Sequence, residues 1–226
     1  RLRISDWKSF KGLNELYAKD NKQVYFQDKV VQGADAATFF TYKDNSHVGQ
    51  DKTCVYYDGQ PRELKDYRLL TPSNINDDYY TYGQSVYNFE LLKMPSGTDL
   101  KHLQSLDYTD WSKDLHHVYW KNKVVKGADP ATFKPMPSLL LTVDSSDDND
   151  KDSDYGRDAM HIYYREVMLK DADYNSFTCG WDAQEQMAFA FDKHRYYEGH
   201  PTPLIRKYRG STNTHNQPHP RPLSER

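Results

Sequence analysis

Aspartates recur at one position of a repeated segment, and carboxylates often serve as general acids and bases in enzymes. Asp20, Asp51, Asp114 and Asp158 each lie four positions before a β-branched residue. A catalytic residue is needed only once, whereas an aspartate that caps its own hairpin loop recurs with every repeat. We therefore expect these aspartates to cap loops rather than to transfer protons.

A further group of carboxylates lies in one irregular acidic stretch. Asp148, Asp150 and Asp152 have the spacing of the first ligands in an EF-hand calcium loop. Ser153 stands where that loop needs glycine, and Ala159 where it needs a bidentate glutamate, so we predict a solvated loop and no metal site. Like-signed charges at one loop suit a basic cleft on a partner protein. The candidate partner contacts in this stretch are Asp147, Asp148, Asp150, Asp152 and Asp154.

The other residue types that carry catalysis lack catalytic spacing. The sequence has no Gly-x-Ser-x-Gly elbow, His-Glu-x-x-His helix, phosphate-binding glycine loop or Cys-x-x-Cys pair. His116, His117, His194 and His200 lack the spacing of metal ligands, and His117 shares its repeat position with His161. We therefore expect a protein without enzymatic activity and without a cofactor.

The two cysteines, Cys54 and Cys179, are too few for a disulfide framework. They are either two buried thiols or one bridge across a long loop. In an oxidising compartment such a bridge would stabilise the fold by roughly 4 to 5 kcal/mol in the entropic model. The sequence leaves both alternatives open.

Aromatic side chains compensate for a small aliphatic content. The 226 residues have a hydrophobic fraction of 37% and a mean hydropathy of -0.98, yet they include 19 Tyr, 9 Phe and 4 Trp. Large rings bury roughly 150 to 250 Å² each, which predicts a thin protein with many half-buried rings. Trp111, Trp120 and Trp181 suit either the core or a partner interface, where tryptophan is a common anchor.

The charge distribution argues against two classes of partner. The 33 acidic and 30 basic side chains give a net charge of -3 and are spread along most of the chain, without the basic patch that binds nucleic acid. No apolar run approaches the roughly 18 residues of a membrane-spanning helix. We predict no nucleic-acid partner and no membrane span.

The candidate residues are positioned by an internal repeat. Each copy is anchored on the first residue of a short aromatic segment such as Val-Tyr-Tyr, and the anchors are spaced 31, 31, 32, 44 and 34 residues apart. The long gap holds the acidic stretch, which is therefore an insertion over residues 144–154. The six anchors are Val24, Val55, Val86, Val118, Ile162 and Tyr196.

A second block follows some anchors at fixed offsets. Gly-Ala-Asp begins it at residues 33 and 127, and a phenylalanine ends it at Phe39, Phe133 and Phe177. Glycine permits an unusual backbone, aspartate caps a helix, and the proline at position 130 suits a first helical residue. The block predicts a single helical turn whose phenylalanine packs back onto the strands as a plug.

The Asp-Lys turn, the Val-Tyr-Tyr segment and the Gly-Ala-Asp-Pro-x-Thr-Phe block together resemble the DKNYY family of bacterial repeat proteins. The pattern is clearest at residues 51–57 and 192–197, and the resemblance covers roughly residues 16–205. It implies a repeat protein that is often exported in Gram-negative bacteria and that has no established catalytic residues.

Each repeat predicts a small β-meander. Val-Tyr-Tyr between turn residues is typical of a short strand, the tyrosine before each Asp-Lys turn gives its hairpin partner, and tight turns at Asp28-Lys29 and Asn122-Lys123 lead to a third strand. We therefore expect an all-β, mainly antiparallel array of about six meander units joined by single helical turns. One unit cannot bury its apolar face alone, so the units stack. We favour an open, curved stack, with a propeller-like ring as the alternative.

The positions of the repeats also predict the domain organisation. Residues 1–15 form a lead-in or cap, residues 16–207 form the repeat domain, and residues 208–226 form a flexible tail because they lack apolar periodicity.

A repeat scaffold without catalytic motifs, interrupted by one acidic insertion, suits protein binding. Our first hypothesis is an immunity protein that neutralises a secreted antibacterial toxin, for example by occluding its active site, in the periplasm or cell envelope. The chain begins at Arg1 without methionine, so a signal peptide is either cleaved or outside the given sequence. The alternative is an envelope protein that is structural or binds glycan or peptidoglycan through aromatic faces.

Overall fold

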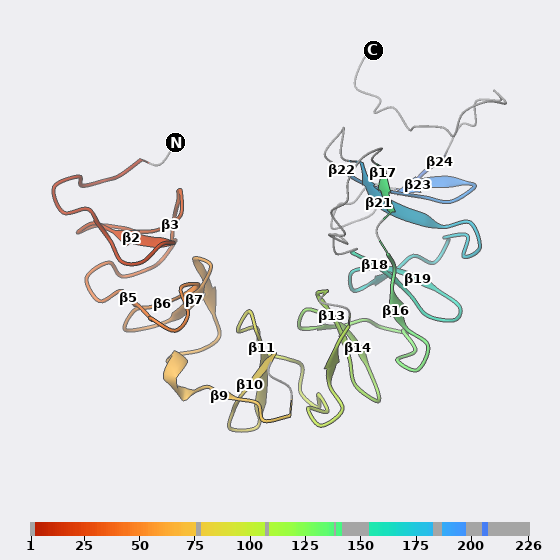
Figure 1. Cartoon of the computed structure of the whole chain (residues 1–226), viewed down its shortest axis with the longest axis horizontal. Helices are drawn as coiled ribbons and strands as arrows, with labels where there is room; N and C mark the ends of the chain where they lie inside the picture. The colour runs from red at the N-terminus through yellow and green to blue at the C-terminus, as the bar shows by residue number, and fades with distance from the viewer. Residues whose placement is uncertain are drawn as a thin grey trace, which may run out of the picture. The chain divides into compact units, whose positions relative to one another are not determined.

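The described part of the chain is built from six short sheets (Figure 1). The computed structural model describes residues 3–75, 78–106, 109–137, 139–141, 154–182, 187–197 and 205–207. Within these ranges the only helix is the 3-10 turn η1 (Tyr67–Leu69), and none is long and apolar enough to cross a membrane. No sheet of the described residues closes into a barrel. The predicted all-β repeat fold is therefore confirmed.

The chain divides into two compact units. Unit 1 comprises Arg1–Met136 and Asp152–Leu169, and unit 2 comprises Pro137–Lys151 and Lys170–Arg226. The first five sheets lie in unit 1, and the sixth lies in unit 2.

Four of the five sheets of unit 1 have four strands each, and these strands lie side by side in chain order. In the fifth sheet, one strand of unit 2 comes between the first two strands along the chain. The first sheet contains β1 (Lys11–Gly12), β2 (Tyr17–Lys19), β3 (Val24–Phe26) and β4 (Lys29–Val30). The second contains β5 (Phe40–Thr41), β6 (Val48–Gln50), β7 (Val55–Tyr57) and β8 (Gln60–Arg62). The third has three strands, β9 (Thr71–Pro72), β10 (Tyr79–Tyr82) and β11 (Ser85–Asn88). The fourth contains β12 (Gln104–Ser105), β13 (Trp111–Lys113), β14 (Val118–Trp120) and β15 (Lys123–Val124). The fifth contains β16 (Lys134–Pro135), β18 (Tyr155–Arg157), β19 (Ile162–Tyr164) and β20 (Val167–Met168).

The acidic insertion interrupts the fifth repeat between β16 and β18. After Met136 the chain enters unit 2, where β17 (Leu139–Leu141) pairs in parallel with β21 (Thr178–Asp182). The sixth sheet is completed by β22 (Met187–Phe191), β23 (Arg195–Tyr197) and β24 (Ile205–Lys207), all antiparallel. Residues 142–153 lie outside the described residues, as does the tail expected at 208–226.

Most repeats have one strand more than the sequence predicted. In each of these four-stranded repeats the predicted three-stranded meander is present, for example β2, β3 and β4 in the first. A two-residue strand, such as β1 or β5, precedes the meander. Two residues are too few to show the alternation that identifies a strand. The turn from the third to the fourth strand is tight and has a left-handed first residue, with φ of 51° at Gln27 and 53° at Lys121.

The core lies between successive sheets, as stacking requires. Val24 and Val31 of the first repeat share a cluster with Tyr56 of the second, and Trp111 and Val118 of the fourth share one with Tyr163 of the fifth. Each repeat thus buries its apolar face against its neighbour within unit 1.

The predicted phenylalanine plugs are confirmed. Phe39, Phe133 and Phe177 are all buried, and the Phe39 ring lies 5.4 Å from the Tyr17 ring and 5.7 Å from the Tyr56 ring, between centroids. A small residue lies beneath the plug. A Cβ added to Gly49 in β6 would lie 2.2 Å from Phe39 Cζ, and one added to Gly156 in β18 would lie 2.3 Å from Phe133 Cζ.

The plug ends a single turn, as expected from its sequence. Phe133 N–H donates to Asp129 O over 2.9 Å, and the Asp129 carboxylate accepts from Ala131 N–H over 3.0 Å. The same turn occurs at residues 6–10, where Lys8 N–H donates to the Asp6 carboxylate over 3.1 Å. This copy lies in the expected lead-in, so the first unit begins before residue 16.

Candidate functional site

The repeated aspartates are buried at the centre of a hydrogen-bonded node. Asp114 Oδ1 accepts from the backbone N–H groups of His116 (2.8 Å) and His117 (2.7 Å), which confirms its predicted role as a loop cap. Asp114 Oδ2 accepts from the Tyr119 hydroxyl over 2.7 Å. The same bond from the tyrosine five residues later forms at Asp20, Asp51, Asp158 and Asp192.

The node also joins one repeat to the turn before it. Asp51 Oδ2 accepts from the backbone N–H of Asp35 (2.8 Å), and Asp114 Oδ2 accepts from that of Asp99 (3.0 Å). In the first repeat Asp6 N–H takes this place, with its nitrogen 2.9 Å from Asp20 Oδ2. This link could not be predicted from the sequence, because its donor is a backbone group of the preceding turn.

The node keeps its carboxylates ionised. Burial alone would raise the pKa of Asp51, Asp114 and Asp158, but the hydrogen bonds that each accepts lower it below its ordinary value. The partner tyrosines shift the other way, because burial and the adjacent carboxylate raise the pKa of Tyr56 and Tyr163. Both oxygens of each of these aspartates thus accept hydrogen bonds that stabilise the fold.

A different pair of positions carries ionisable side chains in three repeats of unit 1. The pair consists of the residues eight before and three after the anchor, and we call it the turn pair. The backbone N–H of the second residue donates to the carbonyl oxygen of the first in every case below. The turn pairs are Leu16 with Gln27, His47 with Asp58, Asp110 with Lys121, and Asp154 with Arg165.

The side chains of three turn pairs combine an acid with a base, but the order of acid and base along the chain varies. In the second repeat His47 Nδ1 lies 2.7 Å from Asp58 Oδ1. In the fourth, Lys121 Nζ lies 3.3 Å from Asp110 Oδ2, and in the fifth, Arg165 Nη2 lies 2.7 Å from Asp154 Oδ2. All six of these side chains are partly exposed, by 29% to 49%. The backbone position is therefore constant while the displayed charges differ from one repeat to the next.

Further contacts connect the turn pairs of the second and fourth repeats. The His47 ring stacks on the Tyr57 ring, with centroids 5.6 Å apart, and the Arg62 guanidinium lies 5.5 Å from the centroid of the same tyrosine ring. Arg62 Nε donates to the backbone oxygen of Glu90 over 2.7 Å, and the Glu90 carboxylate lies 2.9 Å from Lys121 Nζ. The polar row is the continuous set formed by Asp58, His47, Tyr57, Arg62, Glu90, Lys121 and Asp110.

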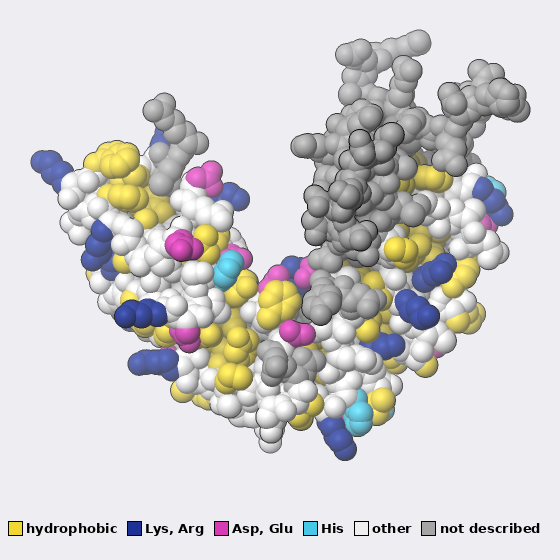
Figure 2. Space-filling view, viewed as in Figure 1, with side chains coloured by type: hydrophobic (Ala, Val, Ile, Leu, Met, Phe, Trp, Pro, Cys, Tyr) yellow, Lys and Arg dark blue, Asp and Glu magenta, His cyan; other side chains and the backbone are white. Residues whose placement is uncertain are grey.

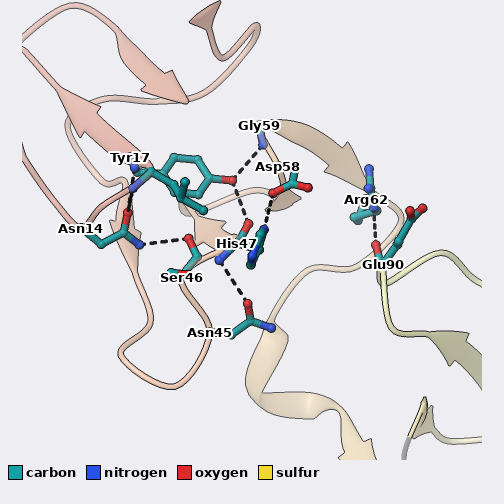
Figure 3. A network of polar contacts seen from close by, with 10 residues as sticks. Asn14, Tyr17, Asn45, Ser46, His47, Asp58, Gly59, Arg62 and Glu90 are labelled. Carbon is teal, nitrogen blue, oxygen red and sulfur yellow. Dashed lines mark hydrogen bonds and ion pairs between the residues drawn. The ribbon is translucent and has the colours of Figure 1, made fainter. Parts of the chain in front are cut away.

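The backbone beneath the polar row is fixed by the first repeat (Figure 3). The Tyr17 hydroxyl donates to His47 O (3.1 Å) and accepts from Gly59 N–H (2.9 Å), so it links the residue before β6 to the β7–β8 turn. Asn14 Nδ2 donates to Ser46 O over 3.0 Å. Burial, offset in part by the Gly59 bond, raises the pKa of Tyr17 to about 12. This support positions His47 and Asp58 without using their side chains.

The polar row is suited to recognition. A histidine held by a carboxylate is part of a nucleophilic triad only when it also faces a nucleophile. Ser46 enters this network through its backbone oxygen, which accepts from Asn14. Among the described residues no group of three or more His, Cys, Asp or Glu side chains is arranged to hold a metal ion. The row instead offers alternating charges around an aromatic ring.

Charge is also mixed on a larger scale. Figure 2 shows Lys and Arg interspersed with Asp and Glu over the face in view, without one extended region of a single sign.

The structure corrects two of the proposed tryptophan anchors. Trp111 is 0% exposed and Trp120 is 5% exposed, and their rings meet edge to face with centroids 4.8 Å apart. The two residues are directly opposite in β13 and β14, so both rings point into the core between the fourth and fifth sheets. Trp181 lies in β21, and its side chain is outside the described residues.

Of the five acidic candidates, only Asp154 lies in the described part of the chain. It is bound by Arg165 and belongs to a turn pair, and not to a loop tip. Asp147, Asp148, Asp150 and Asp152 lie outside the described residues.

Both cysteines are free thiols in this structure, and each lies in a different unit. Cys54 Sγ donates to Val55 O over 3.2 Å, and Cys179 Sγ donates to Pro137 O over 3.8 Å.

Comparison with known proteins supports the family but adds no relative of known activity. No curated protein and no solved structure matches the chain. Residues 2–60, which contain the turn at Asp6, the first sheet and β5 to β7, match the model of the DKNYY family, and this part of the chain is thereby confirmed as DKNYY-like.

Proposed function

We propose that this protein is a non-catalytic protein-binding module and that the polar row of unit 1 is its contact surface. The observation that carries the proposal is the turn pair, where one backbone position displays His–Asp in one repeat and Asp–Lys or Asp–Arg in others. Repeat proteins that bind partners combine a constant internal scaffold with surface residues that change from repeat to repeat.

The energetics of the row favour this role. Its ion pairs are partly exposed, and such pairs contribute only about 0 to 1 kcal/mol to folding. Phe89, 47% exposed and adjacent to Glu90, adds an apolar side chain beside the row. Exposed polar groups around aromatic rings are typical of binding surfaces with a few strong anchors.

More narrowly, we propose that the partner is a secreted antibacterial toxin and that the protein acts as its immunity protein in the periplasm or cell envelope. The repeated aspartates and tyrosines stabilise the scaffold from inside, and the variable surface side chains would make the contacts that cover an enzyme's active site. The glycan-binding alternative is less supported, because Trp111 and Trp120 are buried and offer no stacking platform.

The proposal can be tested with a charge swap. The double substitution Asp110→Lys with Lys121→Asp keeps an ion pair in the same place but inverts the charges that a partner meets. The test measures protection of cells against the toxic product of a neighbouring gene, and the affinity of the purified pair. We expect the swap to lower the affinity at least tenfold. It also removes the Lys121–Glu90 ion pair, but this pair is partly exposed, so the cost in the free energy of unfolding should be only about 1 kcal/mol.

The matched control is the corresponding double substitution of Asn21→Lys and Lys22→Asn, which changes an exposed hairpin loop of the first repeat. If the Asp110 and Lys121 swap binds as tightly as the wild type, the polar row is not the contact surface. Failure of all neighbouring products to bind the wild-type protein would refute the immunity function. A strong loss on replacing Asp147, Asp148, Asp150 and Asp152 by serine would assign the contact to the acidic insertion instead.

A further inference from the structure

Arg62 occupies a repeat position that other repeats fill with a buried aliphatic side chain. The position lies seven residues after the anchor, and in the first, fourth and fifth repeats its backbone N–H donates to the carbonyl oxygen of the anchor over 2.8 Å. Its occupants in these repeats, which are 2% to 6% exposed, are Val31, Val125 and Leu169. In the second repeat Arg62 lies directly opposite the anchor Val55, so the register is the same. An arginine therefore stands where three other repeats have an apolar residue.

The packing of the second repeat does not require this arginine. Leu64, two residues later, is 5% exposed and shares an apolar cluster with Val48 and Val55. The core of this repeat is thus filled from a neighbouring position, and the Arg62 side chain is only half-buried. A residue that departs from the local pattern without a gain in packing is expected at a functional site.

The Arg62 guanidinium is held in place by neutral groups. Nε donates to Glu90 O over 2.7 Å (Figure 3), and Nη1 donates to Gln60 O over 3.2 Å and to Pro61 O over 3.3 Å. The group also lies over the Tyr57 ring. Within the part of the chain that the structure describes, no carboxylate forms an ion pair with Arg62, and no group accepts a hydrogen bond from its Nη2.

Two carboxylates of the polar row that act on Arg62 are already paired with other side chains. Glu90 Oε1 lies 2.9 Å from Lys121 Nζ, and Asp58 Oδ1 lies 2.7 Å from His47 Nδ1. Burial lowers the pKa of the Arg62 guanidinium, and the charges of Glu90 and Asp58 offset this effect only in part. Removing a charge from water is unfavourable unless an opposite charge and hydrogen bonds compensate for it. Arg62 is thus a fixed cation whose desolvation an anionic ligand would balance.

We propose that Arg62 binds a carboxylate of the protein partner, which presents an aspartate or glutamate side chain to the polar row. This inference rests on the proposed function and names the chemistry of the partner at that site. Carboxylates form short, charge-assisted hydrogen bonds with guanidinium groups, and the two N–H groups of Nη2 remain for them. Arginine is also enriched among the few residues that dominate interface energies.

Peptide selection against the full chain tests the proposal. Random peptides displayed on phage are selected for binding to the wild type and counter-selected against Arg62→Leu, which removes peptides that bind elsewhere. We expect the remaining peptides to share an Asp or Glu at one position. Replacing that residue by Asn or Gln should weaken binding at least tenfold, because the charged acceptor is lost.

Two variants separate recognition from folding. Arg62→Gln keeps an N–H donor for Glu90 O but has no charge, so it should bind the acidic peptides at least tenfold more weakly with an unchanged melting temperature. Arg62→Leu restores the aliphatic residue of the other repeats, and its melting temperature should stay the same or rise. The matched control is Arg68→Leu, because Arg68 is 71% exposed and already paired with Asp66; it should leave peptide binding unchanged.

Several results would overturn the role of Arg62. These are selected peptides without a shared acidic residue, an Arg62→Gln chain that binds them as tightly as the wild type, and an Arg62→Leu chain that melts lower, as a purely structural arginine requires. Calorimetric binding of inorganic phosphate by a chain that selects no peptide would assign the arginine to a small anion and also refute the proposal.

Binding to the products of neighbouring genes separates this inference from the proposed function. A product that binds the wild type and Arg62→Gln equally well would leave the protein-binding function intact and refute the carboxylate contact. Acidic peptides that require Arg62, in a chain that binds no neighbouring product, would support the carboxylate site and refute the immunity function.

Discussion

Replacing Asp114 by asparagine tests whether the buried node holds the repeats together. Asparagine keeps Oδ1, which accepts from His116 and His117, but turns the other side of the carboxyl group into an amide NH₂. That NH₂ faces the Asp99 N–H, which donates to Asp114 Oδ2 over 3.0 Å in the wild type. Two donors then meet, while the Tyr119 hydroxyl can rotate and accept.

The expected cost follows from the bonds that change. A hydrogen bond to a charged group contributes about 1.5 to 3 kcal/mol, and an unsatisfied buried donor costs about 1 to 3 kcal/mol. Asp114→Asn loses the bond to Asp99 N–H and the charge on the bond to Tyr119, so we expect a loss of about 3 to 5 kcal/mol in the free energy of unfolding. Tyr119→Phe removes one charged bond and should cost about 1.5 to 3 kcal/mol.

The assay is urea unfolding of the full chain, followed by circular dichroism at neutral pH, for the two single variants and the double variant. Because Asp114 and Tyr119 share a bond, the double variant should be more stable than additivity predicts, by about 1 to 2 kcal/mol. Tyr82→Ala is the matched control, because Tyr82 holds the aspartate position in the third repeat and is 47% exposed. It should change stability by no more than about 0.5 kcal/mol. An Asp114→Asn protein as stable as the control would refute the node as a stabilising element.

Three more outcomes follow from the same structure. The repeated aspartates have lowered pKa values when folded, so their stabilisation is present above the unfolded value of about 3.9 and is lost as pH falls below it; urea midpoints that stay constant from neutral pH to pH 2 contradict this. Gly156→Ala places a Cβ against the Phe133 ring and should cost about 1 to 3 kcal/mol, whereas Gly12→Ala meets nothing within 4 Å and serves as control in the same melts. Quantitative labelling under denaturing, non-reducing conditions should find both Cys54 and Cys179 reactive, and protected thiols would show a bridge.

The repeat could be predicted from sequence because its local signals agree. Val24 and Val118 each start an aromatic strand between turn residues, and Asp20 and Asp114 each cap the loop before it, so propensity and turn chemistry point to one structure. The short strands β1 and β5 escaped prediction, because two residues carry no periodicity. Pairing with a longer neighbour defines them.

The site was harder to predict, because it depends on contacts between repeats. The turn pairs keep fixed offsets from the anchor, but their residue types differ, so a search for repeated residues passes over them. His47 and Asp58 are 11 positions apart and become partners only through the pairing of β6 with β7. Trp111 and Trp120 illustrate the converse. Their residue type fits an anchor as well as a core residue, and only the register that sets them opposite each other decides between the two.

A repeat can lack the node aspartate and still pack on the repeat before it. Tyr82 replaces the node aspartate in the third repeat, yet the array continues, because Tyr87 and Leu91 share an apolar cluster with Val48, Val55 and Leu64 of the second repeat. Successive repeats are thus joined by an apolar contact and a polar one, and one of them can be absent while the other persists. Because neither kind of junction uses the side chains of His47 or Asp58, the displayed charges of that turn pair can change without loss of the scaffold.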